Sequence, residues 1–599
     1  MSAESEIAAA PAHAGKNFSR RIRFGLELRE KLRLGDTQII YIWALCAGFI
    51  GALTALTFGF CVTCVQDLLT GTRGLTQVAA FASLEKWHCV LVPAIGGLFA
   101  GGTLLFMHKF VPVRATEYME AIALGDGYVP PKPSLLRSLS AVFTIGSGAA
   151  IGREGPLIQT SAVAASWLGS KFGLPPPRLR LVVACAAASA MAATFHTPLS
   201  GGLFVGEIVL GALTLDFLAP LLVASCAGYL TLSLLGAVDP IYHVSGEVGL
   251  GSNHLVIALS CIALGVIASL AANGWLWLLK KARRLLNGRH AWLPVRLALA
   301  GALCGVAAIF FPEITGNGYN MIRGIVASQF SPEQAALLLA LKIGIVACVF
   351  GVGTVGGALT PSLTIGTFIG FLFSALMTRL GVPGDHAIAY SLVGMAAFFT
   401  TAANAPMTSL LLVVEFTLAG TLMFPLIVGV VVSHGIARFL HTESMYHDAL
   451  ASGPRSIFSK PLGGVRLIEI ARKHPPTVRP DDNFGAVANV LIRHPSQTIF
   501  ITGKDEEYRG AIVSSDILQF AQTKELAEAI IAIDVSRDNL PVLLPEMKLP
   551  DALKIFASLK HEDSLALVDD AVTKKLLGVV NRSDLYLAIG EIMRREKVR

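Results

Sequence analysis

Long apolar segments separated by short breaks run along the chain from near Thr37 to near Leu440. A membrane-spanning helix needs about 20 apolar residues, and several of these segments reach that length while others are interrupted. The interruptions contain Gly or Pro and fall at residues 152–156, 195–198, 356–361 and 404–406. The pattern predicts an all-α polytopic membrane domain over residues 37–450 that is built partly from broken helices.

After Gly453 the pattern changes to short apolar strands that alternate with amphipathic helices, which is typical of a soluble α/β domain. Two units repeat there, at about residues 455–525 and 535–599. In each unit a Gly-containing strand leads to an Asp six residues later, Gly510 to Asp516 and Gly578 to Asp584. The sequence therefore predicts a domain of two similar α/β units over residues 451–599.

Residues 1–36 have no apolar core of the signal-peptide type. They contain a basic amphipathic stretch with Arg20, Arg21, Arg23, Lys31 and Arg33. A solvated charged helix is one interpretation of this stretch, and a cytoplasmic anchor under the positive-inside rule is the other. We favour the second, which predicts that both termini are cytoplasmic.

The composition supports an integral membrane protein, since 53% of the residues are hydrophobic and only 15% are charged. Soluble domains carry about 25% charged residues. The net charge of +7 is modest, and no basic patch indicates a nucleic-acid partner. Cys61 and Cys64 have CxxC spacing inside an apolar segment, where we expect small core residues rather than a zinc site.

The two halves of the membrane domain share a spacing that indicates an internal duplication. Pro198 precedes Glu207 by nine residues, and Pro406 precedes Glu415 by nine (207 − 198 and 415 − 406). Paired, interrupted apolar segments predict a transporter with its site at the repeat interface. Two unrelated helices with a common Pro-to-Glu pattern are the alternative, and the sequence leaves the orientation of the second copy open.

The most informative break places the charged pair Arg153-Glu154 inside apolar chain. An ionisable residue at membrane depth is costly and usually handles ions or protons. The glycines allow a close backbone approach, and a new helix that starts near Pro156 offers unpaired N–H groups to an anion. Since a carboxylate can occupy such a site itself, the segment predicts an anion pathway gated by Glu154. An ion pair between Glu154 and Arg153 or another base is the alternative.

Residues 152–156 match in full the GREGP/GKEGP motif of the CLC family of chloride channels and chloride/proton antiporters. Residues 357–361 resemble the family's GxFxP motif, with Leu359 in place of Phe. Tyr446 resembles the tyrosine that ends the family's last helix, and residues 316–319 resemble a recurring loop. The resemblance covers about residues 37–450.

The resemblance implies a homodimer in the bilayer, with an inverted repeat and one anion pathway per subunit. It implies that Glu154 is the gate, which blocks the anion when ionised and swings out when protonated. The anion-binding residues that it implies are Arg153, Gly155, Gly357, Ala358, Leu359 and Tyr446. For Tyr446, an ordinary interfacial tyrosine is the alternative.

Two positions depart from the family pattern. Val113 stands where the GSGIP motif supplies a serine to the central anion, which leaves fluoride and nitrate open beside chloride. Ile208 follows Glu207 where proton-coupled members often carry a second glutamate. We therefore expect a channel-like chloride pathway with weak or no proton coupling. The alternative is an antiporter with an inner proton relay at Glu207 or His196, although we favour a structural role for Glu207.

The C-terminal units resemble a tandem CBS pair, which implies adenine nucleotide as a possible ligand, with Asp516 and Asp584 on ribose hydroxyls. A dimerising tail in which these aspartates cap helices is the alternative. The chain shows no nucleophile–base pair, metal-ligand spacing or phosphate loop. We therefore expect a plasma (inner) membrane protein that is not an enzyme and requires no cofactor or metal.

Overall fold

The computed structural model divides the chain by its contacts into two units, Met1–Leu450 and Ala451–Arg599. In the first it describes residues 36–111, 116–123, 125–174, 176–211, 215–235, 242, 254–286, 288, 290–382 and 386–447. In the second it describes residues 466–472, 475–493, 498–513, 530–559, 564–570, 572–582 and 584–585. The basic N-terminal stretch, Val113 and Asp516 lie outside the described residues.

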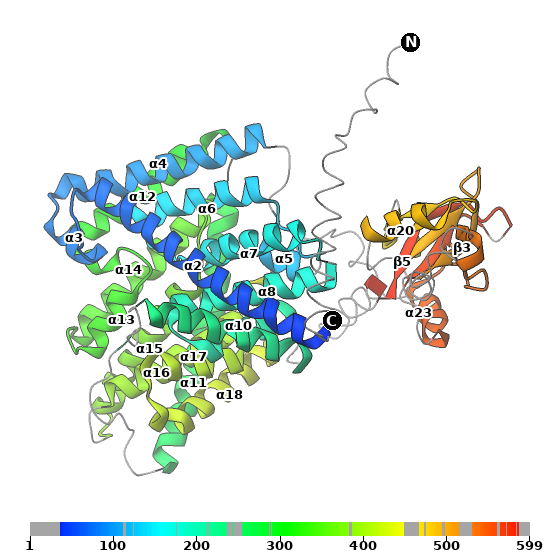
Figure 1. Cartoon of the computed structure of the whole chain (residues 1–599). Coiled ribbons are helices and arrows are strands. Elements are labelled where there is room, and N and C mark those ends of the chain that lie inside the picture. The colour runs from blue at the N-terminus through cyan, green and yellow to red at the C-terminus, as the bar shows by residue number, and fades with distance from the viewer. Residues whose placement is uncertain are drawn as a thin grey trace. The chain divides into compact units, whose positions relative to one another are not determined.

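The first unit is helical throughout its described part (Figure 1). Its α-helices are α2 (Asp36–Thr70), α3 (Gln77–Ser83), α4 (Lys86–Phe110), α5 (Tyr118–Ala123), α6 (Pro131–Gly146), α7 (Glu154–Lys171), α8 (Pro176–Phe195), α9 (Pro198–Phe204), α10 (Leu215–Leu234), α11 (His254–Leu286), α12 (Leu293–Phe310), α13 (Tyr319–Val326), α14 (Pro332–Gly351), α15 (Leu359–Arg379), α16 (Ala387–Ala403), α17 (Pro406–Thr417) and α18 (Met423–Phe439). One π-helical turn, η1 (Val205–Leu210), and short 3-10 turns η2 (His290–Trp292), η3 (Pro312–Ile314) and η4 (Gly420–Leu422) complete it. Among the described residues, 9 helices are long and apolar enough to cross a membrane, so the chain is a multi-pass membrane protein.

Glycines allow a close approach between α4 and α12. A Cβ on Gly97 would lie 2.3 Å from the Leu297 carbonyl oxygen, and one on Gly101 would lie 2.4 Å from the Pro294 Cα. The residue numbers of the contacts rise along α4 from Gly97 to Gly101 and fall along α12 from Leu297 to Pro294, so the two helices are antiparallel. In a membrane the hydrophobic effect does not drive helices together. Small residues instead let the backbones approach closely, so that van der Waals packing can stabilise the pair.

The predicted breaks are confirmed, and two of them have the same local geometry. Helix α8 ends at Phe195, His196 adopts a left-handed conformation with φ 57°, and α9 begins at Pro198. In the second half α16 gives way to α17 through Asn404, with φ 56°. A left-handed residue followed by a helix-starting proline thus ends one helix and begins the next.

The two halves are inverted relative to each other. Glu207, near the end of the α9–η1 segment, accepts the backbone N–H groups of Met407 and Thr408 at the start of α17, at 3.1 and 2.8 Å. Glu415, near the end of α17, accepts the equivalent N–H groups at the start of α9, from Leu199 at 2.9 Å and Ser200 at 2.8 Å. Each helix therefore has its end beside the other's start, which requires an antiparallel arrangement.

The cysteine expectation is wrong in one respect. Cys61 and Cys64 are exposed on α2 rather than packed in the core. A long apolar helix at the edge of a membrane domain presents one side to lipid, so an apolar sequence context does not imply burial.

The second unit contains two α/β halves. The first half has β1 (Thr477–Val478), α20 (Phe484–Arg493), β2 (Ile499–Thr502) and β3 (Tyr508–Ile512), with sheet order β1-β2-β3. The second half has α23 (Leu549–Ser558), β4 (Ser564–Val568) and β5 (Leu576–Asn581), with β4 and β5 antiparallel. The 3-10 turns η6 (Leu467–Glu469) and η7 (Ala532–Val535) flank them. Strands with buried side chains, such as Ile499–Thr502, fit the apolar runs seen in the sequence.

Candidate functional site

The two motif segments meet backbone to backbone within the membrane unit. The Gly152 N–H donates to the Gly357 carbonyl oxygen at 2.9 Å, and the Gly357 N–H donates to the Gly152 carbonyl oxygen at 2.8 Å. Helix α7 begins two residues after Gly152, and α15 begins two residues after Gly357. Two helix N-termini with their unpaired N–H groups and partial positive charge therefore converge on one place.

The Glu154 carboxylate occupies this place and is only 2% exposed. The Thr360 hydroxyl donates to Glu154 Oε1, and Oε2 has no hydrogen-bond partner among the described residues. A Cβ on Gly152 would lie 2.2 Å from Oε2, and one on Gly357 would lie 2.8 Å from it. Glycine at these two positions is therefore what makes room for the carboxylate.

Arg153 caps α7 but does not pair with its neighbouring glutamate. Its guanidinium carbon lies 5.7 Å from the centre of the Tyr319 ring, which is a cation–π contact. Among the described residues, Glu154 forms no ion pair with Arg153 or another base. The buried Arg153 Nε has no hydrogen-bond partner in the described part of the chain. The site thus combines a positive side chain with a carboxylate that it does not bind.

The remaining predicted backbone ligands lie at the same two helix starts. Ala358 caps α15, Leu359 begins it, and Gly155 is in the first turn of α7. N–H groups in these turns have no intrahelical partner and can face an anion. Gly357 differs, because its N–H group is already used in the bridge to Gly152. It serves the site by giving space rather than by donating.

Tyr446 lies in a turn after α18 and is partly buried against the membrane core. Its ring meets Phe204 edge to face at a centroid distance of 5.8 Å. The turn is fixed by two contacts, Met445 N–H to the Ala402 carbonyl at 2.9 Å and Tyr446 N–H to the Ser444 hydroxyl at 3.2 Å. Its hydroxyl is in electrostatic range of Glu154.

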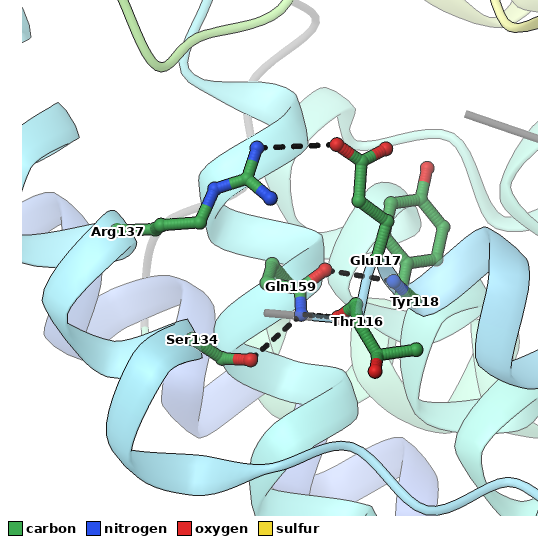
Figure 2. A network of polar contacts seen from close by, with 6 residues as sticks. All are labelled: Thr116, Glu117, Tyr118, Ser134, Arg137 and Gln159. Carbon is green, nitrogen blue, oxygen red and sulfur yellow. Dashed lines mark hydrogen bonds and ion pairs between the residues drawn. The ribbon is translucent and has the colours of Figure 1, made fainter. Parts of the chain in front are cut away.

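A polar network anchors the chain directly after the segment where the family's serine motif is lost (Figure 2). Gln159 of α7 accepts the Tyr118 N–H at 2.8 Å and donates to the Thr116 carbonyl oxygen at 2.9 Å and to the Ser134 hydroxyl at 3.1 Å. Arg137 pairs with Glu117 at 3.1 Å. The sequence analysis did not single out these residues, although a glutamine in the second turn of an apolar helix is a usable signal.

The two residues considered for an inner proton relay, Glu207 and His196, lie where helices begin or end. Glu207 lies in the π-helical turn η1, and its carboxylate also accepts the Thr408 hydroxyl at 2.7 Å. Both of its oxygens are therefore used at the start of α17. Ile208 is buried beside it, and His196 forms the left-handed break before α9. The Pro-to-Glu spacing indicated that Glu207 and Glu415 are equivalent positions of the two repeats. It did not indicate that each glutamate binds the helix start of the opposite repeat.

Lys342 is a further buried charge that the sequence analysis missed. It is 0% exposed within α14, and its ammonium donates to the carbonyl oxygens of Ile314 and Gly316, at 2.8 Å each. These contacts fix the loop that leads to Tyr319. A lysine inside an apolar span was the available signal.

In the C-terminal unit, Asp584 is held by neighbouring side chains. Arg472 donates to both of its oxygens at 2.8 Å, and the Asn581 amide donates at 3.1 Å. The carboxylate is thus engaged in a bidentate ion pair, which a ribose would have to displace.

The comparisons with known proteins agree with this architecture. Residues 96–438 match the family model described as voltage gated chloride channel. The chain belongs to the voltage-gated chloride channel (CLC) family. Residues 531–591 match the CBS domain model, so the resemblance to a CBS domain is confirmed for the second α/β half of the C-terminal unit.

Three similar proteins illustrate the relationship. A putative chloride channel protein ClcB-like from Ralstonia nicotianae is 36% identical over 419 residues, which is 67% of this chain and 95% of that protein. The structure of a slow cyanobacterial Cl-/H+ antiporter covers 70% of this chain and 99% of its own, with TM-score 0.59 and 20% identity. A eukaryotic CLC transporter structure covers 91% and 97%, with TM-score 0.61 and 17% identity. At such identities the two structures show the fold alone, and the predicted fold class is confirmed.

Proposed function

We propose that this chain transports chloride through a pathway gated by Glu154. The observation that carries the proposal is the carboxylate lodged over the paired backbones of Gly152 and Gly357, where two helix N-termini converge. A carboxylate in that position mimics an anion, and protonation abolishes the mimicry. Chloride is favoured over fluoride or nitrate because the relative from Ralstonia nicotianae is described as a putative chloride channel protein.

We further propose that proton coupling is weak or absent. Ile208 cannot titrate, and both oxygens of Glu207 are engaged by Met407 and Thr408. An antiporter that uses His196 is the second candidate, since a protein of the same fold is described as a Cl-/H+ antiporter. Arg153, Leu359 and Tyr446 would line the anion path in either case.

The test is chloride and proton flux in liposomes that hold the purified full chain, with potassium and valinomycin fixing the voltage. We expect chloride flux with no uphill proton movement in the wild type. Glu154→Gln should carry chloride at every pH, whereas Glu333→Gln, at an exposed carboxylate on α14, should behave as the wild type. Wild-type pH dependence in Glu154→Gln would contradict the gate, and uphill proton pumping would establish the antiporter.

We also propose a homodimer in which a second copy covers the face around Glu207 and Glu415. The neighbouring Leu199 and Met407 side chains are 45% and 54% exposed. Carboxylates at membrane depth are costly when they face lipid, so this face is better covered by protein. Cytoplasmic termini and an inner-membrane location complete the proposal.

For the C-terminal unit, we propose that adenine nucleotide binds only if it displaces Arg472 from Asp584. A ribose would offer two hydroxyl donors to the carboxylate, in place of the guanidinium. Thermal unfolding of the full chain with and without AMP, ADP or ATP tests this. No shift with any of the three would favour the purely structural tail.

A further inference from the structure

Thr360 stands out among the groups around the gate because its side chain touches the Glu154 carboxylate directly. It is 0% exposed, and its hydroxyl donates to Glu154 Oε1. Thr360 is the fourth residue of the segment 357–361, and the sequence analysis gave this residue no role. Within the described residues, no other side chain donates a hydrogen bond to this carboxylate.

The other charged and titratable groups that face Glu154 act at longer range. Arg153 precedes it in the chain and lies against the Tyr319 ring. The hydroxyls of Tyr242, Tyr319 and Tyr446 are in electrostatic range from the surrounding elements. The hydroxyls of Tyr242 and Tyr319 are buried without a hydrogen-bond partner in the described part of the chain. None of these groups replaces the direct bond from Thr360.

A hydroxyl has one proton, and an ionised carboxylate can only accept. The bond from Thr360 therefore stabilises the ionised glutamate in the anion path more than the protonated glutamate. Because the site is buried and hydrogen bonds to a charged group are strong, losing this one bond matters. We infer that Thr360 is a positioning residue for the gate: its hydroxyl holds Glu154 in the pathway and sets the pH at which anion flux begins. This inference rests on the proposed gating role of Glu154.

The test is chloride efflux from liposomes that hold the full chain, measured with equal pH on both sides from pH 4 to 8. We expect Thr360→Val to shift the half-maximal pH upward by about one unit, a tenfold change in proton affinity. Thr360→Ser keeps the hydroxyl and should retain the wild-type midpoint. Thr360→Ala is a second hydroxyl-free variant, in case valine does not fit.

Thr367 provides a matched control in the same helix. It is also 0% exposed, and its hydroxyl donates to the Leu363 carbonyl oxygen at 2.8 Å, away from the gate. Thr367→Val should leave the midpoint unchanged. Unshifted midpoints in both Thr360→Val and Thr360→Ala would overturn the inference.

Glu154→Gln separates the two levels of the argument. If it removes the pH dependence while the Thr360 variants do not shift it, the gate stands and the role of Thr360 fails. If Glu154→Gln keeps the wild-type pH profile, the gate itself fails. The double variant Glu154→Gln with Thr360→Val should behave as Glu154→Gln alone.

Discussion

At the residue scale, the same side-chain type has two different roles in this membrane domain. Glu154 is buried over two helix N-termini and keeps one oxygen without a partner among the described residues. Glu207 and Glu415 have both oxygens bound by backbone N–H groups of the opposite repeat. A carboxylate with a vacant acceptor is suited to switching, and one whose acceptors are filled is suited to holding helices together.

The reciprocal contacts predict that Glu207→Ala and Glu415→Ala destabilise the chain to a similar extent, by about 1–3 kcal/mol, since each leaves a helix start uncapped. Thermal stability of the detergent-purified protein measures this. Neither substitution should change proton movement, which we expect to be weak or absent in the wild type. A loss of coupled proton flux in the Glu207 variant but not in the Glu415 variant would instead favour the relay.

At the element scale, helix association relies on backbone contact where glycine removes the side chain. In α4, Gly101 lies against Pro294, whereas nothing lies within 4 Å of a Cβ built at the adjacent Gly102. The two glycines are therefore neighbours in the same helix, but Gly101 is tightly packed and Gly102 faces open space.

This contrast predicts that Gly101→Val separates α4 from α12 and destabilises the domain by about 1–3 kcal/mol. Gly102→Val should be tolerated, because its side chain enters open space. Yield and thermal stability after detergent extraction distinguish the two variants. Equal behaviour of both would contradict the close contact between Gly101 and Pro294.

At the scale of the whole molecule, the proposed dimer is open to a direct test. Met407 is 54% exposed next to the paired carboxylates, and Leu303 is 47% exposed on α12. Met407→Trp should weaken dimerisation, because the larger side chain obstructs a close interface. Leu303→Trp should leave the dimer intact, because we expect this exposed side chain of α12 to face lipid. Light scattering and chemical crosslinking in detergent measure the outcome, and a stable dimer in the Met407 variant would place the interface elsewhere.

The sequence by itself determined the membrane class, the broken helices, the duplicated spacing and the place of Glu154. These features are local, since apolar length, Gly and Pro positions and a charge in apolar chain are all visible within one segment. The C-terminal strands were likewise visible as short apolar runs.

Only the tertiary structure decided how these segments meet. The pairing of Gly152 with Gly357, the donation from Thr360 to Glu154 and the exchange of caps between Glu207 and Glu415 each join residues about 200 positions apart. Such contacts depend on the inversion of the second repeat. The inversion leaves the order of residues along each half unchanged, so it cannot be seen in the sequence. The physical reason is that a sequence pattern reports which surfaces are apolar, whereas the choice of partner depends on how whole helices pack.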